Sequence, residues 1–112
     1  VLTHRYRAQR IPVSIEAKIV YDADKLDSLG AVGVGRAFLF AGRIHARLHN
    51  TAGEALGSAA YSREDTAYRE YLVKLSRLRE FMLTEPGRRI AAERSAVMDA
   101  FFLELNRETG LS

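Results

Sequence analysis

The spacing of the apolar residues constrains this chain most, because it follows the period of an α-helix in nearly every segment. No segment shows a convincing alternation of apolar and polar residues at period two, which is the pattern of a half-buried strand. Four helices are predicted: residues 15–29, residues 31–48, a third that Ser62 opens and that ends near Leu83, and a fourth between Thr84 and Gly110. The sequence therefore predicts an all-α fold.

Local signals place the boundaries of the first two helices. Pro12 disfavours helical backbone in the residue before it, and Ser14 is a predicted N-cap. Gly30 is expected to interrupt or end the first helix. Residues 49–62 contain two glycines and mostly small side chains, which predicts a long loop, and loops of that length are often functional.

The last two helices carry their own start signals. Ser62 with Asp65 three residues later resembles a capping box, in which Glu or Gln usually takes the third position. Thr84 is a predicted N-cap, and Pro86 is tolerated in the first helical turn. The predicted buried stripes of the four helices, in chain order, are Ile15, Ile19, Leu26 and Leu29; Val34, Ala37, Phe38, Ala41, Ile44 and Leu48; Tyr68, Tyr71, Leu72, Leu75, Leu78 and Met82; and Ile90, Val97, Met98, Phe101 and Leu105.

Composition excludes several classes of protein. A length of 112 residues suits one domain with a modest core. The absence of cysteine excludes disulfides and thiolate metal sites, and the net charge of +3 gives only weak support for an anionic partner. Neither a secretory signal nor an apolar run of membrane-spanning length is present, so we expect a cytoplasmic protein without a membrane partner.

The stretch "KIVYDADKLDSLGAVGVGRAF" places three aspartates within six positions of an otherwise apolar helix. Asp24 and Asp27, three residues apart, share one side. One interpretation is a solvated face with Lys18 and Lys25 nearby. The other is a site for a hard divalent cation, with Lys25 holding a phosphate.

Asp22 differs from the other two aspartates, because it falls inside the apolar stripe of its helix. Arg94 likewise falls inside the apolar stripe of the fourth helix. Arginine suits a buried carboxylate because its planar guanidinium can bond both oxygens. We therefore expect Asp22 and Arg94 to form a structural pair that orients the helix carrying Asp24.

The second predicted helix carries Arg36, Arg43 and Arg47 on one side. This pattern is typical of a solvated basic face, and it also permits a contact with phosphate or nucleic acid. Few aromatic residues are interleaved with these arginines, so a dedicated nucleic-acid-binding protein is not expected. The run "GAVGVG" lacks the Lys-Ser or Lys-Thr ending of a nucleotide-cradling loop.

The wording of two stretches resembles one known family. "YDADKLDSLGAVGVGRAF" is similar to the last signature of the HD superfamily of metal-dependent phosphohydrolases, and residues 71–102, "YLVKLSRLREFMLTEPGRRIAAERSAVMDAFF", resemble the tail that follows it. The two stretches agree in order and spacing, and together they cover nearly the whole chain. The resemblance implies a helical HD-type half-fold and hydrolysis of nucleotides or other phosphate esters.

The resemblance also implies roles for particular residues. Asp24 matches the last metal-ligating aspartate, Lys25 would lie beside bound phosphate, Asp27 would shape the pocket, and Arg36 matches a family arginine that would contact substrate. His4, in "VLTHRYR", matches a histidine that some members use as a ligand for a second metal; the other interpretation is an ordinary surface histidine. The implied cofactor is a divalent ion such as Mn, Mg, Fe, Co or Ni, and the implied partner is a phosphate-containing small molecule.

The chain departs from the family pattern at important positions. The His-Asp doublet that names the family is absent, Ala67 stands where a histidine is expected, and Tyr71 replaces a lysine. The resemblance therefore implies the C-terminal half of an active site. The chain is then a fragment, a genuine remnant, or one half of a site that a second polypeptide completes, and we expect a homo-oligomer or a missing N-terminal half as its partner. The alternative is a non-catalytic helical module that serves dimerisation or partner binding.

Overall fold

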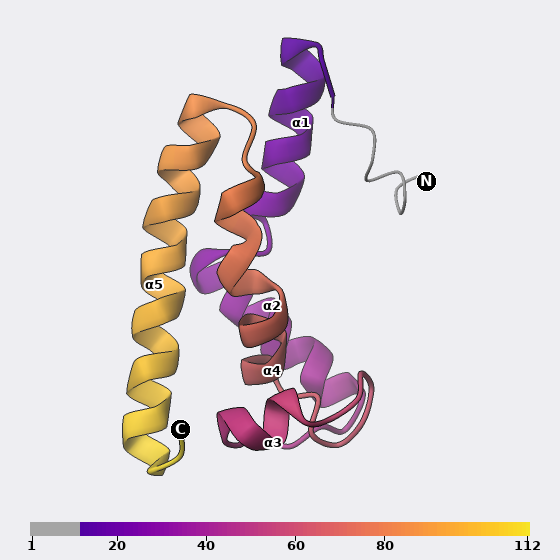
Figure 1. The fold of residues 1–112 in the computed structure, drawn as a ribbon, viewed down its shortest axis with the longest axis vertical. Coiled ribbons are helices and arrows are strands. Elements are labelled where there is room, and N and C mark those ends of the chain that lie inside the picture. Colours follow the sequence, from indigo (N-terminus) through magenta and orange to yellow (C-terminus); the bar gives the residue numbers. More distant parts are fainter. Residues whose placement is uncertain (1–11) are drawn as a thin grey trace.

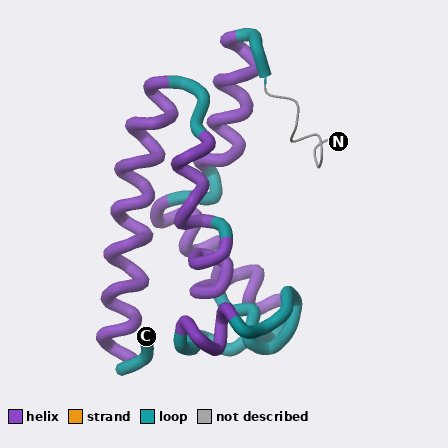
Figure 2. Tube along the Cα trace, in the orientation of Figure 1, coloured by secondary structure: helices purple, strands orange, loops and turns teal. Residues whose placement is uncertain are grey.

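The structure is a computed structural model that describes residues 12–112 (Figure 1). Within these residues no strand is formed, as the tube in Figure 2 shows, and the all-α prediction is confirmed. The elements are α1 (Ile15–Leu26), α2 (Gly30–Arg43), α3 (Ala52–Leu56), α4 (Ala67–Val73), the 3₁₀ helix η2 (Leu75–Phe81) and α5 (Glu85–Thr109).

The longest helix, α5, organises the arrangement. It packs against α1, α2 and η2, and α4 packs against both α2 and α3. In Figure 1, α4 and η2 follow one another alongside α5, with α1 at one end of the molecule and α3 at the other. The principal extents of 45 × 28 × 21 Å describe an elongated body rather than a sphere.

Three predicted helix boundaries are confirmed, two by a capping hydrogen bond and one by its backbone conformation. The Ser14 hydroxyl accepts from the Ala17 N–H at 3.1 Å, and the Thr84 hydroxyl accepts from the Gly87 N–H at 3.0 Å. The last helix ends at Gly110, whose φ of 72° lies in the left-handed region.

The middle of the chain differs from the prediction. The second helix ends at Arg43, and His45 then adopts a φ of 60°. The expected capping box at Ser62 is wrong: Thr66 caps α4, and the carboxylate of Asp65 instead accepts from the Tyr61 N–H at 2.7 Å. The capping box lies inside the predicted loop, where Thr51 and Glu54 start the short helix α3.

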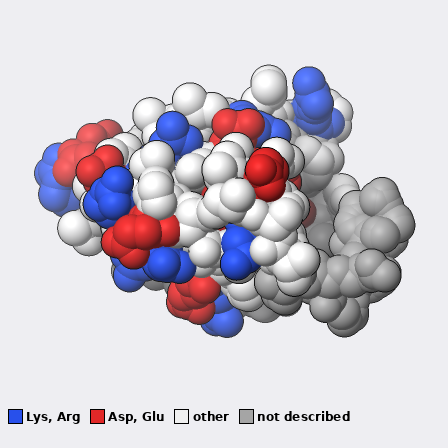
Figure 3. Space-filling model, turned by 90° about the horizontal axis from the view of Figure 1, so that it is seen from above, with Lys and Arg blue, Asp and Glu red and all other residues white. Residues whose placement is uncertain are grey.

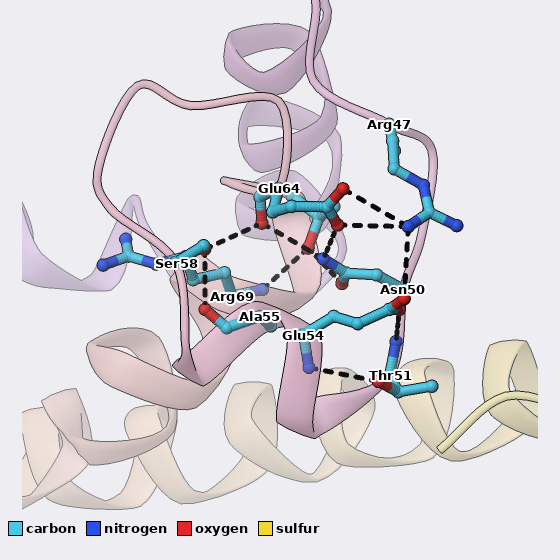
Figure 4. A network of polar contacts seen from close by, with 9 residues as sticks. Arg47, Asn50, Thr51, Glu54, Ala55, Ser58, Glu64 and Arg69 are labelled. Atoms are coloured by element: carbon cyan, nitrogen blue, oxygen red, sulfur yellow. Dashed lines mark hydrogen bonds and ion pairs between the residues drawn. The ribbon is translucent and has the colours of Figure 1, made fainter.

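Side chains hold the segment between α2 and α4 in place (Figure 4). The fully buried Asn50 donates to the Glu64 carboxylate at 2.9 Å and accepts from the Thr66 hydroxyl at 2.9 Å. Arg47 contacts Glu64 at 3.1 Å. These contacts pair the buried amide of Asn50, so the segment can pack against the helices with this group satisfied.

The core lies between α2, α4, η2 and α5. The Phe102 ring stacks on Tyr71 with 4.6 Å between ring centroids. The buried cluster comprises Leu26, Leu29, Val34, Ala67, Tyr68, Leu75, Leu78, Met82, Ala91, Met98 and Phe102. The predicted stripes are thus correct for most of α4 and η2.

The stripes of α1 and α5 were partly wrong. Ile15 and Ile19 are 59% and 55% exposed, and Val97 is 50% exposed. The buried face of α5 is instead built from Gly87, Ala91, Ser95, Met98 and Phe102, and small residues in its first half allow neighbouring elements to approach closely. Leu26, Leu29 and Met98 are buried as predicted, so the helical period is confirmed, and the error lies in the other stripe residues of α1 and α5.

Many apolar side chains of the described part remain in contact with solvent. They include Val13, Ile15, Ile19 and Val20 at and near α1, Val32 and Leu39 of α2, and Val97 and Leu103 of α5. Figure 3 shows one end of the molecule, on which charges of both signs are interspersed with uncharged atoms. None of the helices described between residues 12 and 112 combines the length and apolarity needed to cross a bilayer.

Candidate functional site

The C-terminal half of α1 presents Asp24 on an exposed side of the helix. Among residues 12–112, no hydrogen bond or ion pair occupies the Asp24 carboxylate. Asp27 caps the helix and is also exposed. Both carboxylates are therefore accessible, as either interpretation of this face requires.

Asp22 lies on the opposite side of α1 and is only 3% exposed. Its carboxylate accepts three hydrogen bonds, from the Leu83 N–H at 2.8 Å, the Thr84 N–H at 2.8 Å and the Thr84 hydroxyl at 2.6 Å. Burial raises the pKa of Asp22, but these hydrogen bonds and the positive charge of Arg88 together lower it below its ordinary value. Asp22 thus holds α1 against the N-terminus of α5.

The expected pair between Asp22 and Arg94 is wrong. Arg94 donates to the backbone carbonyl of Leu26 at 2.8 Å, and no ion pair within 4.0 Å links it to Asp22. The prediction that Asp22 is buried is confirmed, but two backbone N–H groups and a hydroxyl at the start of α5 satisfy it in place of a side-chain cation. Backbone N–H groups are not visible in a pattern of side chains.

Gly87 makes the approach of Asp22 possible. A Cβ atom at this position would lie 2.2 Å from the Asp22 Oδ2 atom and 2.8 Å from the Thr84 Oγ1 atom. Any residue other than glycine would displace the carboxylate. Gly87 is therefore part of the joint between α1 and α5.

Two arginines stabilise the C-terminal end of α1, where carbonyl groups lack helical partners. Arg94 bonds the Leu26 carbonyl, and Arg36 donates to the Asp27 carbonyl at 3.2 Å. The side chain of Arg94 passes directly over Gly30, whose φ is 76°. The turn that follows Asp24 is thus fixed from α2 and from α5.

The other predicted site residue of α1, Lys25, lies over the Tyr21 ring with its Nζ atom 4.2 Å from the ring centroid. Lys25 is half-buried and Arg36 is exposed. His4, the second predicted metal ligand, lies outside the described residues.

A cavity of about 190 Å³ opens between α2 and α4, next to the end of α1. Its lining includes Ser28, Arg36, Phe40, Asp65, Glu70 and Lys74. Of these, only Arg36 was a predicted site residue. The other five come from the turn between α1 and α2, from α2, from the segment before α4 and from α4 with its C-cap, and their convergence depends on the fold of residues 44–66, which the periodicity does not specify.

The donor chemistry of Asp24 suits a hard divalent ion, but the described part does not contain a complete metal centre. Among residues 12–112, no group of three His, Asp or Glu side chains is placed to share an ion. Such ions need six or more ligand atoms, of which water supplies only part. Asp24 can contribute one ligand to a centre that other residues complete.

Comparison with known proteins places this geometry in context. No protein-family model matches the chain. Over 104 residues the chain is 39% identical to the uncharacterized protein YpgQ of Bacillus subtilis (strain 168), which covers 93% of this chain and 45% of YpgQ. A crystal structure of YpgQ in complex with ADP is similar with a TM-score of 0.65 and 39% identity, over 87% of this chain and 45% of that chain.

A crystal structure of an HD-superfamily hydrolase from Bacillus thuringiensis is similar with a TM-score of 0.71 and 28% identity. The likeness covers 88% of this chain and 48% of that chain. The fold is HD-like. The chain spans about half the length of these relatives.

Proposed function

We propose that this chain forms the C-terminal half of the active-site domain of an HD-type, metal-dependent phosphohydrolase that acts on nucleotides or other phosphate esters. The observation that carries the proposal is the exposed Asp24 carboxylate, unpaired among residues 12–112, on a fold similar to that of an HD-superfamily hydrolase. A carboxylate that is exposed and has no hydrogen bond or ion pair among residues 12–112 has no structural task in the described part of the chain.

In this proposal Asp24 supplies one metal ligand, and the remaining ligands lie outside residues 12–112. His4 is proposed as one of them. The chemistry that a divalent ion supplies in such a centre is the activation of water near neutral pH. Lys25 and Arg36 would neutralise phosphate oxygens, and Asp27 would shape the pocket through its carbonyl contact with Arg36.

Nucleotides are favoured among phosphate esters by one comparison. YpgQ, which shares 39% of its aligned residues with this chain, is observed in complex with ADP. The same aligned region includes the segment with Asp24, Lys25 and Arg36. Neither finding names the bond that is hydrolysed.

The test is phosphate release from ADP and ATP by the full-length protein with added Mn²⁺, in wild type and in Asp24→Asn. We expect Asp24→Asn to reduce kcat/KM about 100-fold or more, because a neutral amide is a poor ligand for a hard ion. Glu16→Gln is the matched control, since Glu16 is an exposed acid in the first turn of the same helix. Equal activity of Asp24→Asn and wild type would contradict the proposal.

The exposed apolar side chains support a second function, a non-catalytic helical module that binds a partner or a second copy through this surface. The two functions differ in one measurement. The module would show no metal-dependent turnover at full length, and it would lose partner binding when Ile19 and Val20 are replaced by polar residues. The enzyme would show the turnover and its dependence on Asp24.

A further inference from the structure

The charged side chains that line the cavity between α2 and α4 differ in whether a side chain of opposite charge pairs with them. Lys74 lies 3.7 Å from the Glu70 carboxylate, and Asp65 is bonded to Arg69 at 3.2 Å. Arg36 also lines the cavity, and among residues 12–112 its side chain makes no ion pair and one hydrogen bond, to the backbone carbonyl of Asp27. Its guanidinium has five N–H donors, so most of them remain available for an anion in the cavity.

An aromatic pair extends from one wall of the same cavity. Phe40 lines the cavity, and the Tyr61 ring packs against it with 5.9 Å between centroids at an angle of 67°. The two side chains are nevertheless 42% and 72% exposed. Aromatic rings that contact each other but stay open to solvent present flat apolar area to a ligand.

The backbone of Tyr61 is held in an unfavourable conformation. Its φ of 65° lies in the left-handed region, which is strained for a bulky residue. The Tyr61 N–H donates to Asp65 Oδ2 at 2.7 Å, and Asp65, which is 6% exposed, is fixed in turn by Arg69. Strain that is maintained by a partly buried ion pair, and that presents a ring rather than burying it, indicates a functional position.

We infer that this cavity is a nucleoside subsite, in which a nucleobase lies on the Phe40–Tyr61 pair while the phosphates point toward Arg36 and the end of α1. The inference rests on the proposed function and specifies the substrate class of the same site as nucleotides rather than phosphate esters in general. An aromatic platform favours bases of any identity, because every base has a π-face. A single unpaired arginine suits a mononucleotide better than the many phosphates of a nucleic-acid strand.

The experiment is calorimetric titration of the full-length protein without divalent metal, using ADP and inorganic pyrophosphate as probes. Tyr61→Asn removes the ring while keeping a residue that tolerates a positive φ. Phe40→Leu keeps an apolar side chain, and Phe81→Leu is its matched control because Phe81 is 53% exposed on η2, away from the cavity lining.

We expect Tyr61→Asn to weaken ADP binding about tenfold to 100-fold and to leave pyrophosphate binding unchanged. Phe40→Leu should also weaken ADP binding and leave pyrophosphate binding unchanged. Phe81→Leu should change the affinity for neither probe. Arg36→Met should weaken the binding of both probes about tenfold. Arg36→Lys is the second variant in case Arg36→Met folds poorly, and it should lose less affinity because it keeps the positive charge. Tyr61→Gly serves as a second variant with free backbone.

Unchanged ADP affinity in Tyr61→Asn, Tyr61→Gly and Phe40→Leu would overturn the nucleoside subsite. Equal losses of ADP and pyrophosphate affinity in the aromatic variants would overturn it too, since the rings would then only support the fold. The proposed function fails on a different readout, namely the absence of Asp24-dependent turnover, so the two failures are distinguishable.

Discussion

Asp22 shows how one buried carboxylate can determine the position of a functional helix. It lies two residues before Asp24 and faces the opposite way, into the start of α5. The three hydrogen bonds it accepts offset the free energy lost on desolvating the charge. The side of α1 that carries Asp24 is therefore oriented by a residue that never reaches solvent.

The first prediction concerns Gly87. Gly87→Ala should lower the free energy of unfolding by about 3 kcal/mol, because the new methyl group would overlap the Asp22 carboxylate. The measurement is urea unfolding of the full-length protein. Gly35→Ala is the control: its Cβ would meet nothing within 4 Å, and alanine favours a helix more than glycine does, so this variant should be neutral or slightly more stable.

The mechanism can be separated from a general intolerance of Gly87 to substitution. Adding Asp22→Ala to Gly87→Ala removes the overlapping carboxylate, so the two losses should not add. Strictly additive losses would show that the methyl group acts elsewhere.

The second prediction follows from the lowered pKa of Asp22. Its ordinary value is 3.8, and the folded protein holds the proton less tightly than the unfolded chain does. The stabilisation is therefore complete above the ordinary pKa and is lost as the pH falls through the lower folded-state value. Stability measured from about pH 6 to pH 3 should fall further in wild type than in Asp22→Asn. Parallel curves would contradict this.

For single residues, the sequence predicted which polar side chain is buried better than it predicted the hydrogen-bond partner of that side chain. The apolar stripe correctly marked Asp22 as buried, but its partners are two backbone N–H groups and a hydroxyl. Side-chain spacing carries no information on which helix terminus another helix will meet. Arg94 was assigned to the wrong partner for the same reason, because its partner is also a backbone group.

Among the elements, α1 is anchored at its C-terminal end by residues of its neighbours. Arg94 of α5 and Arg36 of α2 both donate to carbonyls in its last turn. Positive charge is favourable at this end of a helix, where the macrodipole is negative. This anchor, the two hydrogen bonds from Arg94 and Arg36, fixes the position of α1, although one side of this short helix is apolar and exposed.

The third prediction tests this anchor. Arg94→Met should reduce the free energy of unfolding by about 1–2 kcal/mol, since it removes a charge-assisted hydrogen bond but keeps an apolar stem over Gly30. Urea unfolding measures it, with Arg89→Met, an exposed arginine of the same helix, as control. Equal effects of the two variants would assign the loss to helix charge alone.

The elements were predictable where local chemistry decides them. Caps at Ser14 and Thr84 and the end at Gly110 follow from the residues themselves. The course of the third helix was not predictable in this way. It starts only at Ala67 and changes to 3₁₀ geometry after Lys74. There, the polar contacts of residues 44–66 and packing on α5 override the apolar period, and the cavity at this place was missed with them.

At the scale of the whole molecule, the exposed apolar surface is the dominant property. Side chains of α1, α2 and α5 contribute to it, and the relatives of known structure are about twice as long. The homo-oligomer or missing-half partner that the resemblance implies would cover such a surface.

The fourth prediction is that the 112-residue chain, expressed alone, self-associates at micromolar concentration, because solvent-exposed apolar area favours burial. Sedimentation velocity measures the mass, and the full-length protein is the reference. A well-folded monomer over the same concentration range would count against the prediction.

The fifth prediction is that the same isolated chain binds Mn²⁺ weakly and has little phosphatase activity, since the described residues hold no group of three potential ligands. Calorimetric titration with Mn²⁺ and hydrolysis of a generic phosphate ester test it. Tight, stoichiometric binding that Asp24→Ala abolishes, together with turnover, would show that the ligand set is complete within these 112 residues.

The joint made by Asp22, Thr84 and Gly87 has a thermodynamic consequence for the proposed site. Because Asp22 and Asp24 belong to one short helix, a molecule that binds Asp24 only in the folded protein also stabilises this joint by mass action. At a concentration 100 times its Kd, such a molecule adds about 2.7 kcal/mol to stability, which is comparable to the loss expected for Gly87→Ala. The abundance of a weakened variant in a cell would then follow the supply of its own ligand.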